Sequence, residues 1–326
     1  MHAAYIEQFG PPDVIRYGEL PAPRPGPTDV LVDVAVTAVN HVDTFVRSGA
    51  WRTPVPLPFV VGRDLVGTVT ATGPEATGFS VGDRVWCNSL GYEGRQGAAA
   101  EQAVVAAERL YRLPDGVEPS DAVAVAHPAA TAYLALFTHG RLRTGETVVV
   151  VGAAGNVGSA VVLMAAQAGA RVIAVASTET AEYVRGLGAA EVVDYRRGHV
   201  AEDIREVAPR GVDMYVDTSA RNELTTAVEL LARRGRIVVL SGLTTRPVLP
   251  VGSLYVKDCS VVGFAISQAS SGELAEAATR INGLLADGLL RPRAVEPLPL
   301  SDAAEGHRLV ESGKVTGKVV LHTQQT

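Results

Sequence analysis

The stretch that decides the fold is Thr147–Ser177, TVVVVGAAGNVGSAVVLMAAQAGARVIAVAS. Its first strand, Val148–Val151, is apolar on both faces, as a central strand of a parallel sheet requires. Ser159–Ala168 is predicted to be a helix of small residues, and Arg171–Ala176 to be the next strand. A glycine-marked turn between strand and helix completes the order that a dinucleotide-binding site needs.

That turn departs from the strict G-x-G-x-x-G fingerprint, because Ala153 replaces its first glycine. We expect Gly155 to let the backbone approach a pyrophosphate and Gly158 to let helix and strand pack closely, while the helix N-terminus attracts the phosphates. The alternative is a tight turn that holds no ligand. The favoured prediction is a nicotinamide dinucleotide held by Ala153, Ala154, Gly155, Asn156, Val157 and Gly158.

The composition narrows the class of protein. The chain has 326 residues, which is long enough for two domains. Of these residues, 47% are hydrophobic and 20% are charged, which is typical of a globular protein. Its net charge of −6 gives no attraction to nucleic acid or to an anionic membrane. Two cysteines, Cys87 and Cys259, cannot build a disulfide framework or a cysteine-rich zinc site. Without a signal pattern or a run of about 20 apolar residues, we expect a cytoplasmic location and no membrane partner.

The regions on either side of Thr147–Ser177 differ in composition and in predicted secondary structure. The first third is rich in Gly and Pro and has short β-type runs at Val30–Val39, Leu65–Ala71 and Arg84–Trp86. Asp121–Phe137 is Ala-rich and predicted to be helical. Strand and helix patterns then alternate, which predicts a doubly wound parallel sheet: Val172–Ala176, Ala181–Leu187, Glu191–Asp194, Asp213–Asp217, Leu224–Leu231, Arg236–Leu240 and Ser260–Phe264. Helices are also expected at Leu274–Asp287 and Ala303–Ser312, the second within a tail of short β runs.

Motifs along nearly the whole chain resemble one family. They are VNHVDTFVRSG at Val39–Gly49, PFVVGRDLVG at Pro58–Gly67, GDRV at Gly82–Val85, TAYL at Thr131–Leu134, GAAEVVDY at Gly188–Tyr195 and LVESGKVTGKVVL at Leu309–Leu321. With these residues and the glycine turn, the chain resembles the zinc-free, zeta-crystallin-like quinone oxidoreductase branch of the medium-chain dehydrogenase/reductase superfamily. The resemblance implies an α/β protein: a GroES-like β-rich catalytic domain at 1–125, completed by 265–326, and a Rossmann domain at 126–264. The active site would lie in the cleft between them.

The resemblance also bears on metal binding. Zinc-dependent members of the superfamily bind a catalytic zinc with Cys, His and Cys, and the corresponding positions here are Asn40, Arg63 and His127. Asn is a poor zinc ligand, and a guanidinium stays protonated and has no lone pair to offer. We therefore expect no zinc. Hydride transfer to electron-poor acceptors, such as quinones and conjugated enones, stays feasible without one because the developing charge is spread through a π-system.

The second strand of the nucleotide domain bears on the choice of cofactor. An NAD site usually has an acid about 20 residues after the glycines, but Ala176 stands there and is followed by Ser177 and Thr178. These hydroxyls favour the 2′-phosphate of NADPH. The resemblance implies further phosphate contacts from Tyr195 and Arg196 after the next strand, with a solvated charged turn at Arg196 and Arg197 as the alternative. Glu179 keeps NADH open as the less favoured cofactor. Further cofactor contacts are predicted at Asn40, Thr131, Thr218, Ser219, Gly242 and Leu243.

Five residues are candidates for catalysis: Asn40, Phe45, Trp51, Arg63 and His127. Asn40 is a candidate hydrogen-bond donor to substrate or cofactor, or else the cap of the following helix. Phe45 and Trp51 could form an aromatic wall for a flat quinone, or pack in the core. Arg63 could bind the cofactor or an acidic substrate, or form an ion pair with Asp64 or Asp43. His127 could relay a proton, although a hydrogen-bonded structural role is favoured.

Two alternatives concern the helix after Asn40 and the assembly. Asp43 and Arg47 are spaced i, i+4 and could pair with each other. Ser260–Phe264 is expected at the edge of the parallel sheet, and an unpaired apolar edge favours a homodimer.

The predicted function is NADPH-dependent, metal-independent hydride transfer to a small-molecule quinone. A reductase of activated C=C bonds in enones, enals or enoyl substrates would use the same residues. An NADPH-binding structural or regulatory protein with little turnover is a further alternative.

Overall fold

The computed structural model describes residues 1–323, and the chain folds into two compact units. One unit contains residues 1–127 together with residues 270–323, and the other contains Pro128–Ala269. None of the helices within the described residues has the length and apolar character needed to cross a membrane.

The unit Pro128–Ala269 is built on a six-stranded, fully parallel sheet in the order β11-β10-β9-β12-β13-β14. The strands are β9 (Thr147–Val151), β10 (Arg171–Ala176), β11 (Glu191–Asp194), β12 (Val212–Asp217), β13 (Leu231–Val239) and β14 (Ser260–Gly263). Because the chain moves outward from β9 in both directions, the order reverses between β9 and β12, where ligands bind in doubly wound sheets. The predicted doubly wound α/β fold and the edge position of the Ser260 strand are confirmed.

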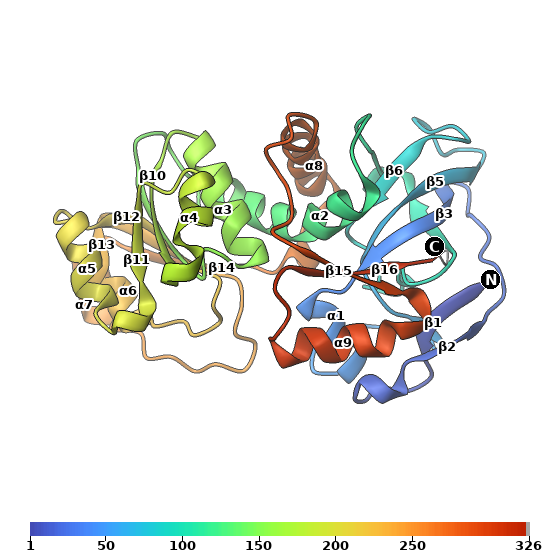
Figure 1. The fold of residues 1–326 in the computed structure, drawn as a ribbon, viewed down its shortest axis with the longest axis horizontal. Helices are drawn as coiled ribbons and strands as arrows, with labels where there is room; N and C mark the ends of the chain where they lie inside the picture. Colours follow the sequence, from blue (N-terminus) through green and yellow to red (C-terminus); the bar gives the residue numbers. More distant parts are fainter. Residues whose placement is uncertain (324–326) are drawn as a thin grey trace. The chain divides into compact units, whose positions relative to one another are not determined.

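Helices pack around this sheet (Figure 1). They are α3 (Asn156–Gln167), α4 (Ala181–Gly186), α5 (Val200–Val207), α6 (Leu224–Leu230) and α7 (Val251–Val256). The central strands are buried on both faces, with Val149, Ile173 and Ile237 fully inaccessible to solvent, and this explains their unbroken apolar sequences.

The other unit is mostly β. Its larger sheet runs β15-β16-β3-β5-β6-β8, with β7 also paired to β3, and its smaller sheet runs β2-β1-β4. The strands are β1 (His2–Ile6), β2 (Arg16–Glu19), β3 (Asp29–Ala38), β4 (Phe59–Val60), β5 (Asp64–Thr72), β6 (Arg84–Cys87), β7 (Gln102–Ala106), β8 (Tyr111–Arg112), β15 (Val295–Pro299) and β16 (Lys318–His322). Its helices include α1 (His41–Ser48), α8 (Ser271–Ala286) and α9 (Ala303–Ser312), and α2 (Pro119–Tyr133) crosses the boundary at Pro128.

The tail of the chain is part of the β-rich unit. Strand β16 pairs antiparallel with β3, so that Val320 lies opposite Ala38, and Figure 1 shows the two strands side by side. This pairing brings the first residue of β16, Lys318, to the end of β3, where Asn40 begins the turn into α1.

Candidate functional site

The glycine turn follows β9 directly. Gly152 has a φ of +75°, and a Cβ at this position would lie 2.7 Å from the Thr218 hydroxyl oxygen, so the tight turn requires glycine. The Thr218 hydroxyl donates to the Val151 carbonyl at 2.7 Å, which ties the end of β12 to the turn. Sequence reasoning missed Gly152 because it lies one residue before the fingerprint that we searched.

Gly158 lies where α3 passes over the turn. A Cβ at Gly158 would approach the Gly152 carbonyl oxygen to 2.1 Å, so the predicted close packing of helix and strand does depend on this glycine. Gly155 is the N-cap of α3 with a φ of −75°, and a Cβ there would lie 3.2 Å from the same oxygen. Gly155 therefore leaves the backbone of the turn uncovered, although its own φ does not require glycine.

Most of the predicted cofactor residues lie at one edge of the parallel sheet, whereas Asn40 belongs to the β-rich unit. Ser177 and Thr178 follow β10, Tyr195 and Arg196 follow β11, Thr218 and Ser219 follow β12, and Gly242 and Leu243 come shortly after β13. Since parallel strands end at the same edge, these residues share the edge with the glycine turn. Thr131 is buried in α2 and belongs to the same unit.

Two of these residues, Ser219 and Gly242, lie beside residues that sequence reasoning missed, Asp217 and Asn222. Ser219 donates through its backbone N–H and its hydroxyl to one oxygen of Asp217, each at 2.7 Å. Gly242 has a φ of +89°, and a Cβ there would lie 2.4 Å from the Asn222 amide nitrogen. Asn222 also lines a cavity of about 380 Å³ with Arg221, Thr245 and Arg246, beyond the ends of β12 and β13. No sequence motif marks Asn222, whose φ of +53° reflects this local turn.

The loops after β10 and β11 form a charged corner. The Arg196 guanidinium pairs with the Glu179 carboxylate, and both side chains are more than half exposed. Asp194 accepts from the Thr178 hydroxyl, from the Thr178 backbone N–H at 3.2 Å and from the Arg196 backbone N–H at 2.9 Å. Hydrogen bonds from Ser177, from the backbone and from Arg196 lower the pKa of Glu179, and those from Thr178 and the Arg196 backbone lower the pKa of Asp194. Both carboxylates are therefore charged at neutral pH.

In the β-rich unit, Asn40 is the centre of a buried polar cluster. The Lys318 ammonium donates to Asn40 Oδ1, while Asn40 Nδ2 donates to Asp64 Oδ2 at 2.8 Å and to Asp43 Oδ2 at 3.3 Å. The Asn40 backbone N–H donates to the same Asp43 oxygen at 2.7 Å, which caps α1. Asn40 is the N-cap residue of α1, and both hydrogens of its side-chain amide point at carboxylates.

Arg63 and His127 lie at the edges of this cluster. Arg63 Nε is 3.8 Å from Asp43 Oδ1, and His127 Nδ1 is 3.6 Å from Asp64 Oδ1. The Arg63 side chain is 2% exposed, and its Nε and Nη2 have no hydrogen-bond partner among the described residues. The guanidinium lies 5.3 Å from the centre of the Tyr92 ring, a cation–π contact.

The charges of the cluster balance. Burial raises the pKa of the Asp43 carboxyl and lowers the pKa of the Lys318 ammonium and of the Arg63 guanidinium, while the opposite charges counteract each shift. Two carboxylates, Asp43 and Asp64, stand against the two cations. Sequence reasoning named Asp43 and Asp64 only as possible pairing partners and missed Lys318, whose partner Asn40 is 278 residues away.

The pairing of Asp43 with Arg47, left open above, is wrong. Asp43 faces Asn40 and Arg63, whereas Arg47 is buried and pairs with Glu311 on α9. The i, i+4 spacing is outweighed because both side chains point into the unit, where tertiary partners replace water. Phe45 and Trp51 are only partly buried and are linked by a backbone hydrogen bond of 3.0 Å from Trp51 to Phe45.

The donor set in this region does not fit a zinc ion. Arg63 places a protonated guanidinium in the cluster, and the Asn40 oxygen is already an acceptor for Lys318. Among residues 1–323, no three His, Cys, Asp or Glu side chains converge as metal ligands would.

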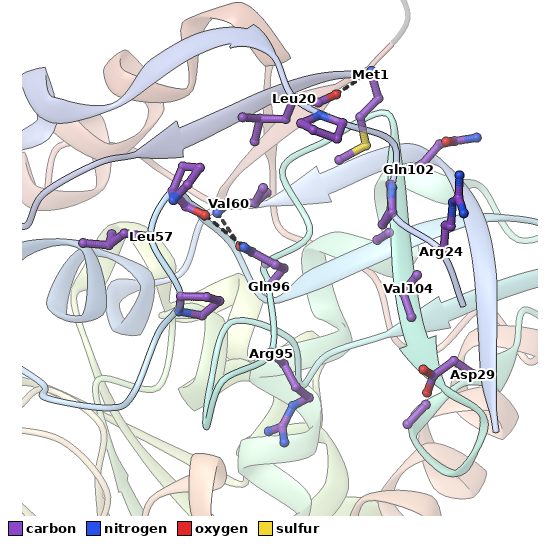
Figure 2. A pocket seen from close by; sticks show the side chains of 17 residues that line it. Met1, Leu20, Arg24, Asp29, Leu57, Val60, Arg95, Gln96, Gln102 and Val104 are labelled. Atoms are coloured by element: carbon purple, nitrogen blue, oxygen red, sulfur yellow. Dashed lines mark hydrogen bonds between the residues drawn. The ribbon is translucent and has the colours of Figure 1, made fainter. Parts of the chain in front are cut away.

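A groove of about 520 Å³ lies elsewhere in the β-rich unit. Figure 2 shows it between Leu20, Leu57, Val60 and Val104, with Gln96 held across it by hydrogen bonds to the backbone of Pro58 and Val60. None of the predicted site residues lines this groove, so it is not part of the candidate site.

Comparisons with known proteins agree with this geometry. Residues 26–115 match the alcohol dehydrogenase GroES-like domain family, and residues 156–282 match the zinc-binding dehydrogenase family. The chain is 30% identical to a quinone oxidoreductase from Homo sapiens over 325 residues, covering 98% of this chain and 97% of that protein.

Two solved structures are similar over almost the whole chain. A quinone oxidoreductase from Pseudomonas syringae has a TM-score of 0.87 at 29% identity, with 98% of this chain and 99% of that one covered. An NAD-dependent alcohol dehydrogenase has a TM-score of 0.88 at 32% identity, with 99% and 100% covered. The chain therefore belongs to the quinone oxidoreductase branch of the medium-chain dehydrogenase/reductase superfamily, and it is an NAD(P)H-dependent oxidoreductase.

Proposed function

We propose that this enzyme reduces quinones with NADPH and without a metal ion. The observation that carries the proposal is the buried Arg63 guanidinium, whose Nε and Nη2 have no hydrogen-bond partner within residues 1–323, at a position where zinc-dependent members of the superfamily carry a metal ligand. A fixed cation with open donors can stabilise negative charge that develops on an acceptor oxygen, which is the task of a Lewis acid in those relatives. The quinone oxidoreductase of Homo sapiens supports a quinone as the acceptor.

Each step of this reaction is assigned to particular residues. When bound, a reduced nicotinamide supplies a hydride, and one quinone, one hydride and one proton give one hydroquinone. Arg63 donates hydrogen bonds to the acceptor oxygen on which charge develops. His127, beside the Asp64 carboxylate, serves as the group through which a proton reaches that oxygen. The glycine turn and the N-terminus of α3 hold the pyrophosphate, and the chain's main contribution is to orient the reactants and exclude water.

The charged corner after β10 and β11 supports NADPH over NADH. Ser177, Thr178 and Arg196 offer two hydroxyls and a guanidinium to a 2′-phosphate. The Arg196–Glu179 pair is exposed on both sides, so its replacement by an Arg196–phosphate contact costs little. Glu179 is the feature that would serve NADH instead, by accepting from a ribose hydroxyl.

A steady-state assay tests the acceptor and the cofactor together. Purified enzyme is given NADPH or NADH with a panel of benzoquinones and naphthoquinones and, separately, a panel of enones and enals. We expect kcat/KM to be at least tenfold higher for the best quinone than for the best enone, and dialysis against a chelator to leave it unchanged. A higher kcat/KM with enones would replace quinone reduction by C=C reduction. Tight NADPH binding without turnover would favour the non-enzymatic alternative, and stoichiometric zinc by elemental analysis would refute metal independence.

Two matched variants test the cofactor site. Arg196→Gln should weaken NADPH binding about 10- to 100-fold, because it removes a charge-assisted contact to phosphate, and should leave NADH binding nearly unchanged. Glu179→Gln should strengthen NADPH binding, because Arg196 no longer has a competing carboxylate. Dissociation constants from nicotinamide fluorescence measure both, and equal effects on the two cofactors would refute the assignment.

We also propose that the enzyme is a homodimer that pairs through β14. This strand is at the edge of the parallel sheet, and the preceding helix α7 exposes Val251, Tyr255 and Val256, each at least 60% accessible. An apolar patch beside an open strand edge favours a second copy of the same sheet. Light scattering should give twice the chain mass, and Val262→Pro, which removes a ladder N–H from β14, should give the monomer.

A further inference from the structure

Lys318 is the one charged side chain of the cluster that comes from the C-terminal tail. It begins β16, is 4% exposed, and is one of three lysines in the chain. Its ammonium donates to Asn40 Oδ1, across the point where β16 lies beside the end of β3. Lys318 lies in the LVESGKVTGKVVL motif that carries the family resemblance, but no role was predicted for it above.

The Lys318 contact decides which way the Asn40 amide points. With Oδ1 toward the ammonium, Nδ2 faces Asp64 at 2.8 Å and Asp43 at 3.3 Å. The reversed amide would set its two hydrogens against the ammonium and its oxygen against two carboxylates, so the observed orientation is the only one that satisfies all three groups. Without Lys318, the amide oxygen would lose its charged donor.

Asn40 in turn holds the two carboxylates that face the proposed acceptor residues. The second oxygen of Asp43 lies 3.8 Å from Arg63 Nε, and the second oxygen of Asp64 lies 3.6 Å from His127 Nδ1. The contacts therefore branch from Lys318 through Asn40 into two arms, one of which ends at Arg63 and the other at His127. The members of both arms are nine-tenths or more buried, so water does not substitute for a lost contact.

We propose that Lys318 is a positioning residue, which fixes Asn40 and, through the two carboxylates, sets where Arg63 and His127 stand relative to the acceptor. This inference rests on the proposed function, in which Arg63 and His127 act on the acceptor oxygen. Lys318 itself touches neither of these two residues in any described hydrogen bond or ion pair. The hydrogen-bonded route from Lys318 to Arg63 and His127 therefore runs through Asn40, while the Lys318 charge also acts directly on Asp43 and Asp64.

A double-mutant cycle tests this dependence. Lys318→Met, Asn40→Ala and the double variant are compared in kcat with the best quinone, in NADPH dissociation constant and in thermal unfolding. We expect K318M and N40A each to lower kcat at least tenfold, with the NADPH dissociation constant within twofold of the wild type. In the N40A background, K318M should cause a smaller further loss of kcat than in the wild type, because the hydrogen-bonded route is already absent and only the direct effect of the charge on the carboxylates remains.

Lys257→Met is the matched control. This lysine donates to the carbonyl oxygens of Val228, Glu229 and Leu231 at 3.0–3.1 Å in the other unit. K257M should therefore lower the unfolding temperature while leaving kcat unchanged, which separates loss of stability from loss of positioning.

Several outcomes would overturn the inference. Wild-type kcat in K318M is one, and a full additional loss when K318M is combined with N40A is another. If K318M does not fold, the cycle is run with Lys318→Arg, which keeps the charge but changes the donor geometry. We expect at least a threefold loss of kcat that disappears in the N40A background, and wild-type turnover in K318R would then refute the role. Absence of quinone turnover in the wild type would instead refute the proposed function.

Discussion

Replacing Gly158 by Ala is the sharpest perturbation of the nucleotide unit. The added Cβ would lie 2.1 Å from the Gly152 carbonyl oxygen, 2.8 Å from its carbon and 2.9 Å from Ala153 Cα. All three are backbone atoms, so no side chain can rotate away. Ordinary contacts begin at 3.4 Å, and α3 therefore has to move away from the turn by about 1.3 Å.

The cost of that movement follows from two opposing effects. Overpacking of this kind typically destabilises by about 1–3 kcal/mol, and Ala is better than Gly inside a helix by about 1 kcal/mol. Because the clash here involves rigid backbone on both sides, we expect a net loss of about 2 kcal/mol in the free energy of unfolding. A shift of more than 1 Å at the N-terminus of α3 should also weaken NADPH binding about 100-fold, since its N–H groups no longer meet the phosphates.

Two other glycines provide the controls. A Cβ at Gly155 would lie 3.2 Å from the same oxygen, so Gly155→Ala should change stability little while hindering the approach of the pyrophosphate. Gly186 at the end of α4 has nothing within 4 Å, so Gly186→Ala should keep both stability and binding. Urea unfolding followed by circular dichroism and fluorescence titration with NADPH measure the series. A Gly158→Ala protein that equals Gly186→Ala in both measurements would refute the packing argument.

Three further predictions concern stability. Partial burial acts to raise the pKa of Glu146, but hydrogen bonds from Arg236 and the Arg143 backbone lower it overall. The ionised Glu146 therefore adds to the free energy of unfolding above pH 4.5, and this stabilisation is lost as the pH falls below that value. In urea unfolding, the stability of Glu146→Gln should fall less steeply in acid than that of the wild type. Burial, with the charge of Arg47, lowers the pKa of His307 to about 3. As the pH falls, His307 therefore binds a proton in the unfolded chain at a higher pH than in the folded chain. Because of this difference, the free energy of unfolding should fall by about 1.4 kcal/mol per pH unit between pH 6.5 and 3. His307→Gln should remove this part of the pH dependence. Lys257→Met leaves three carbonyls near the end of α6 without their donor and should cost about 1–2 kcal/mol, measured at neutral pH.

Elements that bury apolar side chains could be predicted closely from the sequence. The strand Glu191–Asp194 and the helix Ala303–Ser312 have the predicted bounds. Helices α5 and α7 were not predicted. Helix α5 is strongly amphipathic but buries only Ile204, and α7 has six residues and buries none of them. Strand β13 begins at Leu231, five residues before the prediction, since its exposed Arg233 and Arg234 do not resemble a buried strand.

The nucleotide edge was easier to predict than the buried cluster, for a physical reason. The order of parallel strands alone brings the residues after β10, β11, β12 and β13 to one edge, so strand ends in the sequence suffice. The cluster depends on side chains from α1, β5, α2, β16 and the turns after β3 and before β5, which meet through tertiary packing. Only the pairing of β16 with β3 brings Lys318 to Asn40, and no local pattern encodes that pairing.

Charge balance explains why Arg63 can be buried in the β-rich unit. A lone guanidinium in this place would be strongly unfavourable, and removal of one partner from a buried pair costs about 3–5 kcal/mol because the remaining charge has no compensation. Asp43 and Asp64 compensate Arg63, but two carboxylates with one cation would leave an excess negative charge, which Lys318 neutralises. A return to a zinc-ligating side chain at residue 63 would therefore not restore a metal site by itself. It would leave two carboxylates facing one ammonium, with the Asn40 oxygen still held by that ammonium, so the four charged residues have to change together.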